Sequence, residues 1–373
     1  MIGFADIVGQ DRAIETLTVA MKANRLPHAL LFAGPVGVGR RTLAEALAGA
    51  ILCPNSNQQS HEACGHCEDC HLLQAGNHPD LHMIYKELAA HHPDANVRSS
   101  VMQELGIPII RHFLIAPAMQ SPARGKGKVF IILEAELMSD VAQNALLKTL
   151  EEPPPGVTII LLCQRPEELL ATTLSRCSLI RLNRLEHDFV VSKLTAEGCD
   201  EGQAGFWARF TSGSLGESLR LAKQDLYETK TQIIDRLSSM GPGGDGKLSD
   251  DLTKIMEKLA KAQVKEAKER DGGDLSVRLA NRQSVALMLR LIASAYQDAI
   301  RLQGADNETQ PALINSEQLE NVSAIASRFE PQDLAEIIEQ LSEYERLLWR
   351  NVSPKLVWDN VVITCASANP LVL

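Results

Sequence analysis

Short apolar segments alternate with segments of helical periodicity along the first half of the chain. The apolar segments are too short for core helices and are typical of buried strands. The expected strands are 29–33, 128–133, 157–163 and 179–182. The expected helices include 11–23 before the first strand, and 42–52 and 140–150 between later ones. Continuous apolar strands separated by helices predict a parallel sheet that is covered on both faces.

The second half of the chain has a helical pattern throughout. The pattern over residues 184–240 predicts a small helical domain, and the glycines of 241–246 indicate a flexible linker. A charged amphipathic helix is expected within 250–270, where acids and bases are interleaved, so a solvated helix with one packed stripe is favoured over a nucleic-acid-binding arm. Its apolar stripe consists of Leu252, Ile255, Met256 and Leu259.

The C-terminal part, 275–373, predicts a further all-helical domain. Its expected helices are 275–303, 316–329, 331–350 and 354–366.

In the first half of the chain, the polar segment 86–106 is expected to be an exposed loop.

Composition narrows the class of protein. The 373 residues carry a net charge of −10, which argues against binding through a broadly basic surface, and only 4% are aromatic, which argues against base-stacking platforms. No apolar run approaches the ~18 residues of a membrane span, and the N-terminus lacks the order of a signal peptide. We expect a cytoplasmic protein without membrane contact.

Four of the eight cysteines cluster between 53 and 70. Cys53 and the run Cys64-x2-Cys67-x2-Cys70 offer four soft ligands, which suits a closed, tetrahedral, structural Zn²⁺ site. The other four cysteines are expected to be small buried hydrophobes. The neighbouring histidines, expected to be exposed polar residues rather than ligands, are His61, His66 and His71.

A turn resembling a phosphate loop follows the first strand. Gly34 and Gly39 have the spacing of G-x-x-x-x-G-K-[ST], and Gly37 adds backbone freedom for N–H groups to face an anion. The pattern of strand, glycine loop and helix predicts a nucleotide-binding type of fold.

The loop departs from the active pattern in its chemistry. Arg40 replaces the lysine, Arg41 replaces the hydroxyl that binds magnesium, and Thr42 lies one residue late. After the next strand, Glu134 is placed to polarise water, but Leu133 replaces the metal-binding aspartate. We therefore expect no ATP hydrolysis, and either weak nucleotide or anion binding or none.

Arg176 follows the third strand and a short helix, in the sequence Ser175-Arg176-Cys177. An arginine near a helix end often caps carbonyl groups. In ring-forming ATPases, however, an arginine at this place reaches the γ-phosphate of a neighbouring subunit. Arg176 is therefore a candidate arginine finger that acts in trans.

Together these features resemble the clamp-loader subunits of bacterial DNA polymerase III. The matching segments, besides the four cysteines, are 4–10, 27–34, 78–80, 144–154 and 174–177. The resemblance covers about residues 1–220 and implies an AAA+ P-loop domain over 1–183 with an inserted zinc module at 53–70. It further implies a helical lid over 184–240, a linker and charged helix over 241–274, and a helical collar over 275–373 that joins subunits into a ring.

The resemblance also implies a function and partners. Such a ring, containing tau/gamma and delta subunits, loads the beta sliding clamp onto primer-template DNA. The departures at Arg40, Arg41 and Leu133, with Gly216 where the lid's sensor arginine is expected, favour the subunit type that does not hydrolyse ATP. The alternative is an ATP-hydrolysing tau/gamma-like subunit. Polymerase chemistry would belong to the holoenzyme, because no paired carboxylates suit nucleotidyl transfer.

Overall fold

The chain divides into two compact units. The computed structural model describes residues 3–57, 62–99, 104–224, 226–241, 244–271, 276–305, 312–348 and 352–367. The first unit contains Met1–Glu186 and Gly213–Glu217, and the second contains His187–Ser212 and Ser218–Leu373. The finer division into lid, linker and collar stays a prediction.

A five-stranded parallel sheet, in the order β2-β3-β4-β1-β5, forms the centre of the first unit. The strands are β1 (Ala29–Ala33), β2 (Leu81–Ile84), β3 (Lys128–Ile132), β4 (Val157–Cys163) and β5 (Ser178–Arg181). Strand β1 lies between β4 and β5, and its Leu31 pairs with Leu161 of β4 and Leu179 of β5. Every residue of β1, β3 and β4 is buried, which explains their continuous apolar sequence and confirms the predicted parallel α/β fold.

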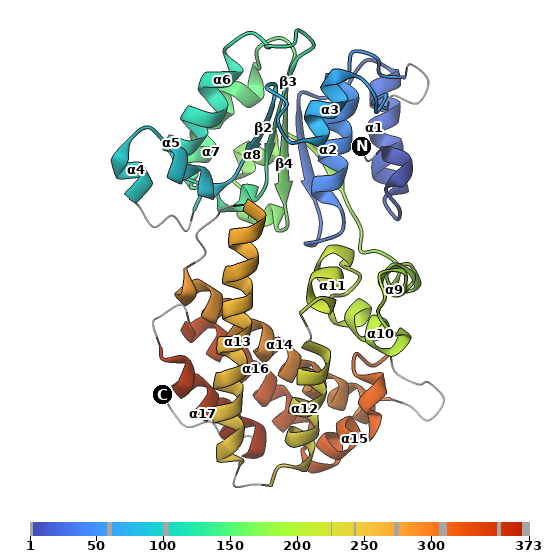
Figure 1. The fold of residues 1–373 in the computed structure, drawn as a ribbon, viewed down its shortest axis with the longest axis vertical. Helices are drawn as coiled ribbons and strands as arrows, with labels where there is room; N and C mark the ends of the chain where they lie inside the picture. The colour runs from blue at the N-terminus through green and yellow to red at the C-terminus, as the bar shows by residue number, and fades with distance from the viewer. Residues whose placement is uncertain are drawn as a thin grey trace. The chain divides into compact units, whose positions relative to one another are not determined.

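Helices cover both faces of this sheet (Figure 1). One face packs against α1 (Asp11–Lys22), α2 (Arg40–Leu52) and α3 (Glu68–Gln74). The opposite face packs against α5 (Ile107–Ile110), the π-helical turn η3 (Arg111–Ile115), α6 (Ala116–Ala118), α7 (Asp140–Glu151) and α8 (Ala171–Leu174). Short 3₁₀ turns complete the unit: η1 (Phe4–Asp6), η2 (Lys86–His91), η4 (Ala135–Leu137) and η5 (Pro166–Glu168).

Strand β2 is absent from the strands that the sequence predicts. It lies at the edge of the sheet and, within the described residues, pairs with β3 alone. Its sequence, Leu-His-Met-Ile, is interrupted by His82, whose ring stacks on Phe130 with centroids 4.6 Å apart. A short, half-buried edge strand with a histidine in it gives neither the continuous apolar run nor the alternation that marks a strand.

The expectation that 86–106 is an exposed loop is wrong. The segment contains η2 and α4 (Ala95–Ser99), and Ala89 and Leu105 are buried. Leu105 also donates its N–H to the carbonyl of Leu137 at 2.7 Å. A few apolar side chains bring this polar sequence onto the core beside α5 and α7, which its composition conceals. Residues 100–103 lie outside the described part of the chain.

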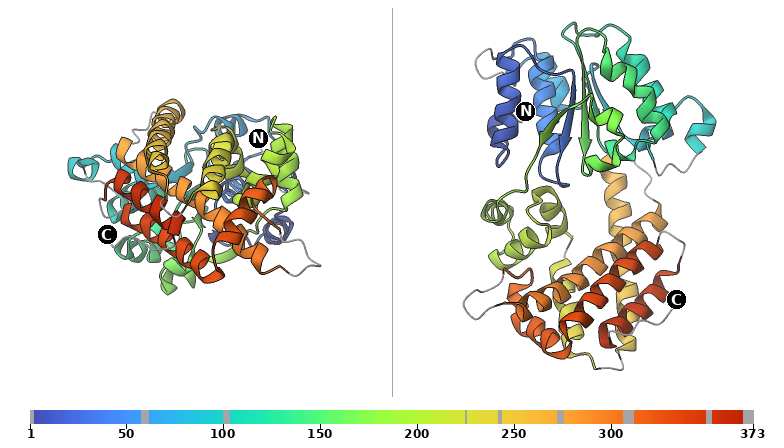
Figure 2. Two further views of the ribbon diagram at one scale, coloured as in Figure 1. Left: turned by 90° about the horizontal axis from the view of Figure 1, so that it is seen from below. Right: turned by 180° about the vertical axis from the view of Figure 1, so that it is seen from behind.

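The second unit is built from helices, as predicted (Figure 2). They are α9 (His187–Ala196), α10 (Glu201–Phe210), α11 (Leu215–Ala222, which begins in the first unit), α12 (Leu226–Ser239), α13 (Gly246–Asp271), α14 (Val277–Gln303), α15 (Leu319–Arg328), α16 (Pro331–Leu348) and α17 (Pro354–Ser367), with the 3₁₀ turn η6 (Ser316–Gln318). Helix α14 packs against α13, α15 and α16. No helix among the described residues is both long and apolar enough to cross a membrane.

The charged helix α13 buries the predicted stripe. Leu252, Met256 and Leu259 are buried and Ile255 is half-buried, whereas the intervening charged residues face water. The helix packs on α14 and α17. It begins at Gly246, so the linker predicted over 241–246 ends at the first residue of the helix; residues 242 and 243 are outside the described part.

Asp80 stabilises, through hydrogen bonds, the turn that leads into β3. Its carboxylate, in a residue that is 1% exposed, accepts the N–H groups of Ala123 and Arg124, each at 2.8 Å. Its own carbonyl accepts the N–H of Val129, the second residue of β3. One buried side chain thereby joins the starts of two neighbouring strands.

We predict that Asp80→Ala lowers the free energy of unfolding by about 2–3 kcal/mol, because two backbone N–H groups lose a charged acceptor. Glu257→Ala is the control: Glu257 is exposed in the middle of α13, and its loss should cost less than about 0.5 kcal/mol. Urea denaturation followed by circular dichroism measures both. Equal losses in the two variants would contradict the role of Asp80.

Candidate functional site

The four clustered cysteines converge on one point. Cys53 caps the C-terminus of α2, Cys67 caps the N-terminus of α3, and Cys64 and Cys70 lie on either side of Cys67. All four Sγ atoms lie within 4.8 Å of one another. The Sγ atoms of Cys53 and Cys67 are 3.8 Å apart, and those of Cys64 and Cys70 are 3.9 Å apart.

These distances fit a tetrahedral metal ion rather than disulfides. A Zn–S bond of about 2.3 Å places tetrahedral sulfurs about 3.8 Å apart, whereas a disulfide needs about 2.05 Å. The four cysteines are therefore placed so that they could hold a metal ion. His66 and His71 are exposed, in agreement with their predicted role as surface residues, and His61 lies outside the described part.

Backbone N–H groups surround the sulfur atoms. The N–H of Gly65 points to Cys70 Sγ at 3.3 Å, and those of Cys64 and Cys70 point to Cys53 and Cys67 Sγ at 3.4 Å each. Gly65 has φ of +80°, a left-handed conformation that favours glycine. A hydrogen bond from the N–H of His66 is the main cause that lowers the pKa of Cys64 to about 6, whereas burial raises the pKa of Cys70 to about 12.

An ion-pair network holds the cysteine module against the sheet. Arg124 donates from Nε to Asp69 and from Nη2 to Glu68, each at 2.7 Å. Asp69 also contacts His78 Nε2 at 3.3 Å, and both of these residues are buried. Hydrogen bonds from Arg124 are the main cause that lowers the pKa values of Glu68 and Asp69. The module is thus attached to the segments that precede β2 and β3.

The glycine loop lies between β1 and α2, where the sequence predicts it. Gly34 donates its N–H to the carbonyl of Cys163, and a Cβ on Gly34 would lie 2.5 Å from the carbonyl oxygen of Leu182. Gly37 and Gly39 have φ of +74° and +99°. Helix α2 begins at Arg40, two residues earlier than predicted, so the free N–H groups of its first turn follow the loop directly.

The two arginines of the loop have different surroundings. Arg41 is 64% exposed and forms an ion pair with Glu45 at 2.7 Å, one turn further along α2. Arg40 is half-buried, and within the described residues its buried Nη1 has no hydrogen-bond partner. Burial lowers the pKa of Arg40, and the charges of Glu136, Cys163 and Glu134 partly oppose that change. Thr42 is half-buried.

Glu136 is a site residue that sequence reasoning missed. Its Oε1 accepts the N–H of Gln164 at 3.0 Å, while its Oε2 is buried without a hydrogen-bond partner among the described residues. Among the acidic groups, Glu136 attracts Arg40 most strongly. The predicted Glu134 is 55% exposed and lies 3.7 Å from Lys86. Only the nearby sequence Glu-Ala-Glu could have indicated the second carboxylate.

Arg176 lies in the turn between α8 and β5. Its Nη1 donates to the carbonyl of Thr172 at 2.8 Å, and Nε and Nη2 pair with Glu151, the last residue of α7. The side chain is 31% exposed. The guanidinium is therefore fixed in direction and still reachable from solvent.

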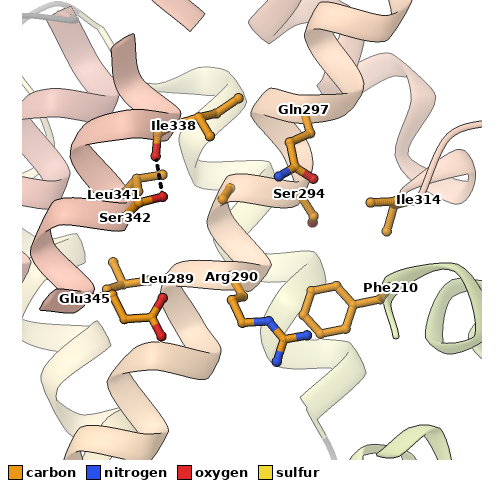
Figure 3. A pocket seen from close by; sticks show the side chains of 11 residues that line it. Phe210, Leu289, Arg290, Ser294, Gln297, Ile314, Ile338, Leu341, Ser342 and Glu345 are labelled. Atoms are coloured by element: carbon orange, nitrogen blue, oxygen red, sulfur yellow. Dashed lines mark hydrogen bonds between the residues drawn. The ribbon is translucent and has the colours of Figure 1, made fainter. Parts of the chain in front are cut away.

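A pocket of about 170 Å³ in the second unit is not indicated by the sequence (Figure 3). It lies between α14 and α16, with Phe210 of α10 at one end. The guanidinium carbon of Arg290 lies 5.2 Å from the centre of the Phe210 ring, and Glu345 lines the same pocket. These residues come from distant parts of the chain, so no local pattern marks them.

Comparison with known proteins gives consistent matches. Residues 9–186 match the family described as DNA polymerase III, delta subunit. The delta′ subunit of DNA polymerase III from Escherichia coli is 35% identical over 233 residues, which cover 62% of this chain and 65% of that protein. The tau/gamma subunit from Haemophilus influenzae is 33% identical over 242 residues, covering 63% of this chain and 33% of that protein.

Among solved structures, a gamma-subunit-related protein of DNA polymerase III from Thermotoga maritima matches with a TM-score of 0.41 and 15% identity, covering 95% of this chain and 98% of that one. This chain spans less than two thirds of the length of the curated relatives above. The similarity thus relates residues 9–186 of this chain to the family described as DNA polymerase III, delta subunit, and the relatives that it matches include delta′ and tau/gamma subunits.

Proposed function

We propose that this chain is the delta′-type subunit of a bacterial clamp loader, which helps to place the beta sliding clamp on primed DNA. The observation that carries the proposal is the 35% identity with the E. coli delta′ subunit over 233 residues, combined with a glycine loop that lacks the lysine of an active ATPase. Its neighbours in the ring would be tau/gamma and delta subunits. Sliding clamp and primer-template DNA would be met within that assembly.

In this proposal the chain has no ATPase activity of its own. Leu133 supplies no ligand where an aspartate normally holds magnesium, and a guanidinium replaces the compact ammonium of the loop. Arg40 is flanked by Glu134 and Glu136, so the positive charge of the loop is already partly balanced by the protein. Loss of the metal site and internal charge balance both work against binding of magnesium-ATP.

We predict that the isolated chain does not hydrolyse magnesium-ATP and binds it weakly or not at all. Isothermal titration calorimetry measures binding, and a phosphate-release assay on the same sample measures hydrolysis. A tau/gamma subunit assayed in parallel is the positive control. Micromolar binding with steady turnover would contradict an inactive site.

That opposite outcome would favour the second candidate, an ATP-hydrolysing tau/gamma-like subunit. The 33% identity with the H. influenzae tau/gamma subunit over 242 residues and the retained backbone path of Gly37 and Gly39 support it. In such a subunit Thr42 would have to supply the hydroxyl for magnesium, and Glu134 would polarise water.

The cysteine module is proposed to hold one structural Zn²⁺. All four ligands are thiolates, which zinc prefers over harder cations, and a site closed by four protein ligands leaves no position for a substrate. The ion would join the C-terminus of α2 to α3. The described residues of the connection between Cys53 and Cys64 form no helix or strand, so the ion would hold together segments that regular structure does not. Its role would be to fix the module, not to catalyse a reaction.

We predict about one zinc per chain for the purified protein, and loss of the metal in Cys67→Ser because a hydroxyl is a poor replacement for a thiolate ligand. Cys199→Ser is the control, since Cys199 lies outside the cluster and should leave the zinc content unchanged. Elemental analysis by plasma mass spectrometry measures both. A metal-free, stably folded wild type, or equal zinc loss in both variants, would contradict the zinc site.

Arg176 is proposed to act as an arginine finger for the ATP site of a neighbouring subunit. Its guanidinium is held by Glu151 and by the carbonyl of Thr172, and it stays partly exposed. A γ-phosphate carries more negative charge than one carboxylate, and its oxygens match the guanidinium fork. It would therefore compete with Glu151 for this side chain when the two subunits meet.

We predict that Arg176→Ala lowers ATP hydrolysis at the site it serves by about 10³-fold, as for other arginine fingers. In a loader reconstituted with tau/gamma and delta subunits, the total ATP turnover should fall by the fraction that this one site contributes. Arg165→Ala is the control, because Arg165 is also a surface arginine in an ion pair, with Glu168. Loader turnover that is unchanged by Arg176→Ala, or lowered equally by both variants, would contradict the role.

A further inference from the structure

The segment Gly213–Glu217 contacts the glycine loop directly, backbone to backbone. Gly216 donates its N–H to the carbonyl of Gly37 at 3.2 Å. A Cβ placed on Gly37 would lie 2.1 Å from Ser214 Oγ and 3.1 Å from the nitrogen of Glu217. A side chain at Gly37 would force the Ser214 hydroxyl to turn away and the backbone at Glu217 to shift slightly.

The segment is itself fixed to the first unit. Gly213 has φ of +81°, its carbonyl accepts the N–H of Leu185, and a Cβ on it would lie 2.4 Å from the carbonyl oxygen of Leu185. Ser214 is 2% exposed, and its Oγ accepts the N–H of Glu217 at 3.3 Å, which stabilises the first turn of α11. The contact with Gly37 is thus made by an ordered, buried turn.

A second contact holds the next residue of the loop. Gln10, which is 3% exposed, donates from Nε2 to the carbonyls of Val38 at 3.2 Å and Asn183 at 2.8 Å. Its Oε1 accepts the N–H of Asn183 at 3.0 Å. Two successive carbonyls of the loop, those of Gly37 and Val38, are therefore hydrogen-bonded by protein groups from outside the loop.

We propose that residues 213–217 form a built-in cap that keeps the phosphate loop closed in the absence of nucleotide. The protein itself supplies the contacts that order this loop, so the loop needs no phosphate to keep its shape. Gly37 is the residue that permits the approach, because a Cβ on Gly37 would lie 2.1 Å from Ser214 Oγ, whereas a Cβ on Gly216 would make an ordinary contact 3.4 Å from the Cα of Gly37. This inference rests on the proposed inactive ATP site and describes how that site is held.

The amide of Gly216 reports on the cap. Gly216 is the second residue of α11, where an N–H group has no acceptor inside the helix. Any protection of this amide from hydrogen exchange must then come from the carbonyl of Gly37. We expect it to exchange at least about tenfold more slowly than an unprotected amide in the full chain without nucleotide, and to change less than about twofold when magnesium-ATP is added.

Two glycine variants provide a matched comparison. Gly37→Ala should accelerate exchange at Gly216 by about tenfold or more, because the new methyl group displaces Ser214. Gly39→Ala places the same methyl group on the same loop at another left-handed residue, φ +99°, with no atom within 4 Å, so it should leave Gly216 protected. Hydrogen exchange followed by NMR measures this amide, and circular dichroism checks that both variants fold.

An unprotected Gly216 amide in the wild type would overturn the cap, as would protection that arises only with magnesium-ATP or equal acceleration in both variants. If Gly37→Ala fails to fold, hydrogen exchange at Gly216 in the unmodified chain, with and without nucleotide, still tests the cap. These results are independent of Arg176, so a failed cap would leave the arginine-finger proposal intact, and a failed finger would leave the cap intact.

Discussion

The parallel pairing of β1 between β4 and β5 is the constraint on which the candidate nucleotide site depends. Parallel strands bring their carboxyl ends to one edge of the sheet. The loop after β1, Glu134 after β3, Gln164 after β4 and Asn183 after β5 therefore meet without any long-range signal in the sequence. Since β1 is buried on both faces, its end has little freedom, and the direction of the loop is set before any side chain of the site contributes.

Close packing at this edge explains why the loop keeps its shape although its chemistry has changed. Gly34 lies against the backbone of Leu182, and Gly37 lies against Ser214, so glycines remain necessary for steric reasons. Lysine and aspartate have no such steric role. Under the proposed function, their replacement by Arg40 and Leu133 would remove the electrostatic function of the site while leaving its backbone intact. A partly buried guanidinium still costs desolvation energy, which the carboxylates of Glu136 and Glu134 partly offset.

The sequence predicts those features that depend on local pattern or on spacing. Four strands, the glycine loop and the cysteine cluster belong to this group, because burial and metal ligation restrict residue types at fixed intervals. Strand β2, Glu136 and the role of Gln10 depend on tertiary neighbours instead. Gln10 is a polar residue at the start of a helix in sequence, yet in the fold it joins Val38 to Asn183, which is 173 positions away. No periodicity carries that information.

Arg40 and Arg176 illustrate how environment separates two arginines that look alike in sequence. Arg40 has a buried nitrogen without a hydrogen-bond partner in the described part of the chain, and the charges of Glu136 and Glu134 act on it. A magnesium-bound phosphate would therefore have to compete with charges that are already in place. Arg176 is partly exposed, and its main partner is one carboxylate on the surface. Exchanging that carboxylate for a phosphate needs no burial of new charge. Under the proposed function, the chain has therefore lost the use of its inward arginine while it keeps an outward one at a fixed position. A subunit with these two properties would serve its neighbour's chemistry without performing its own.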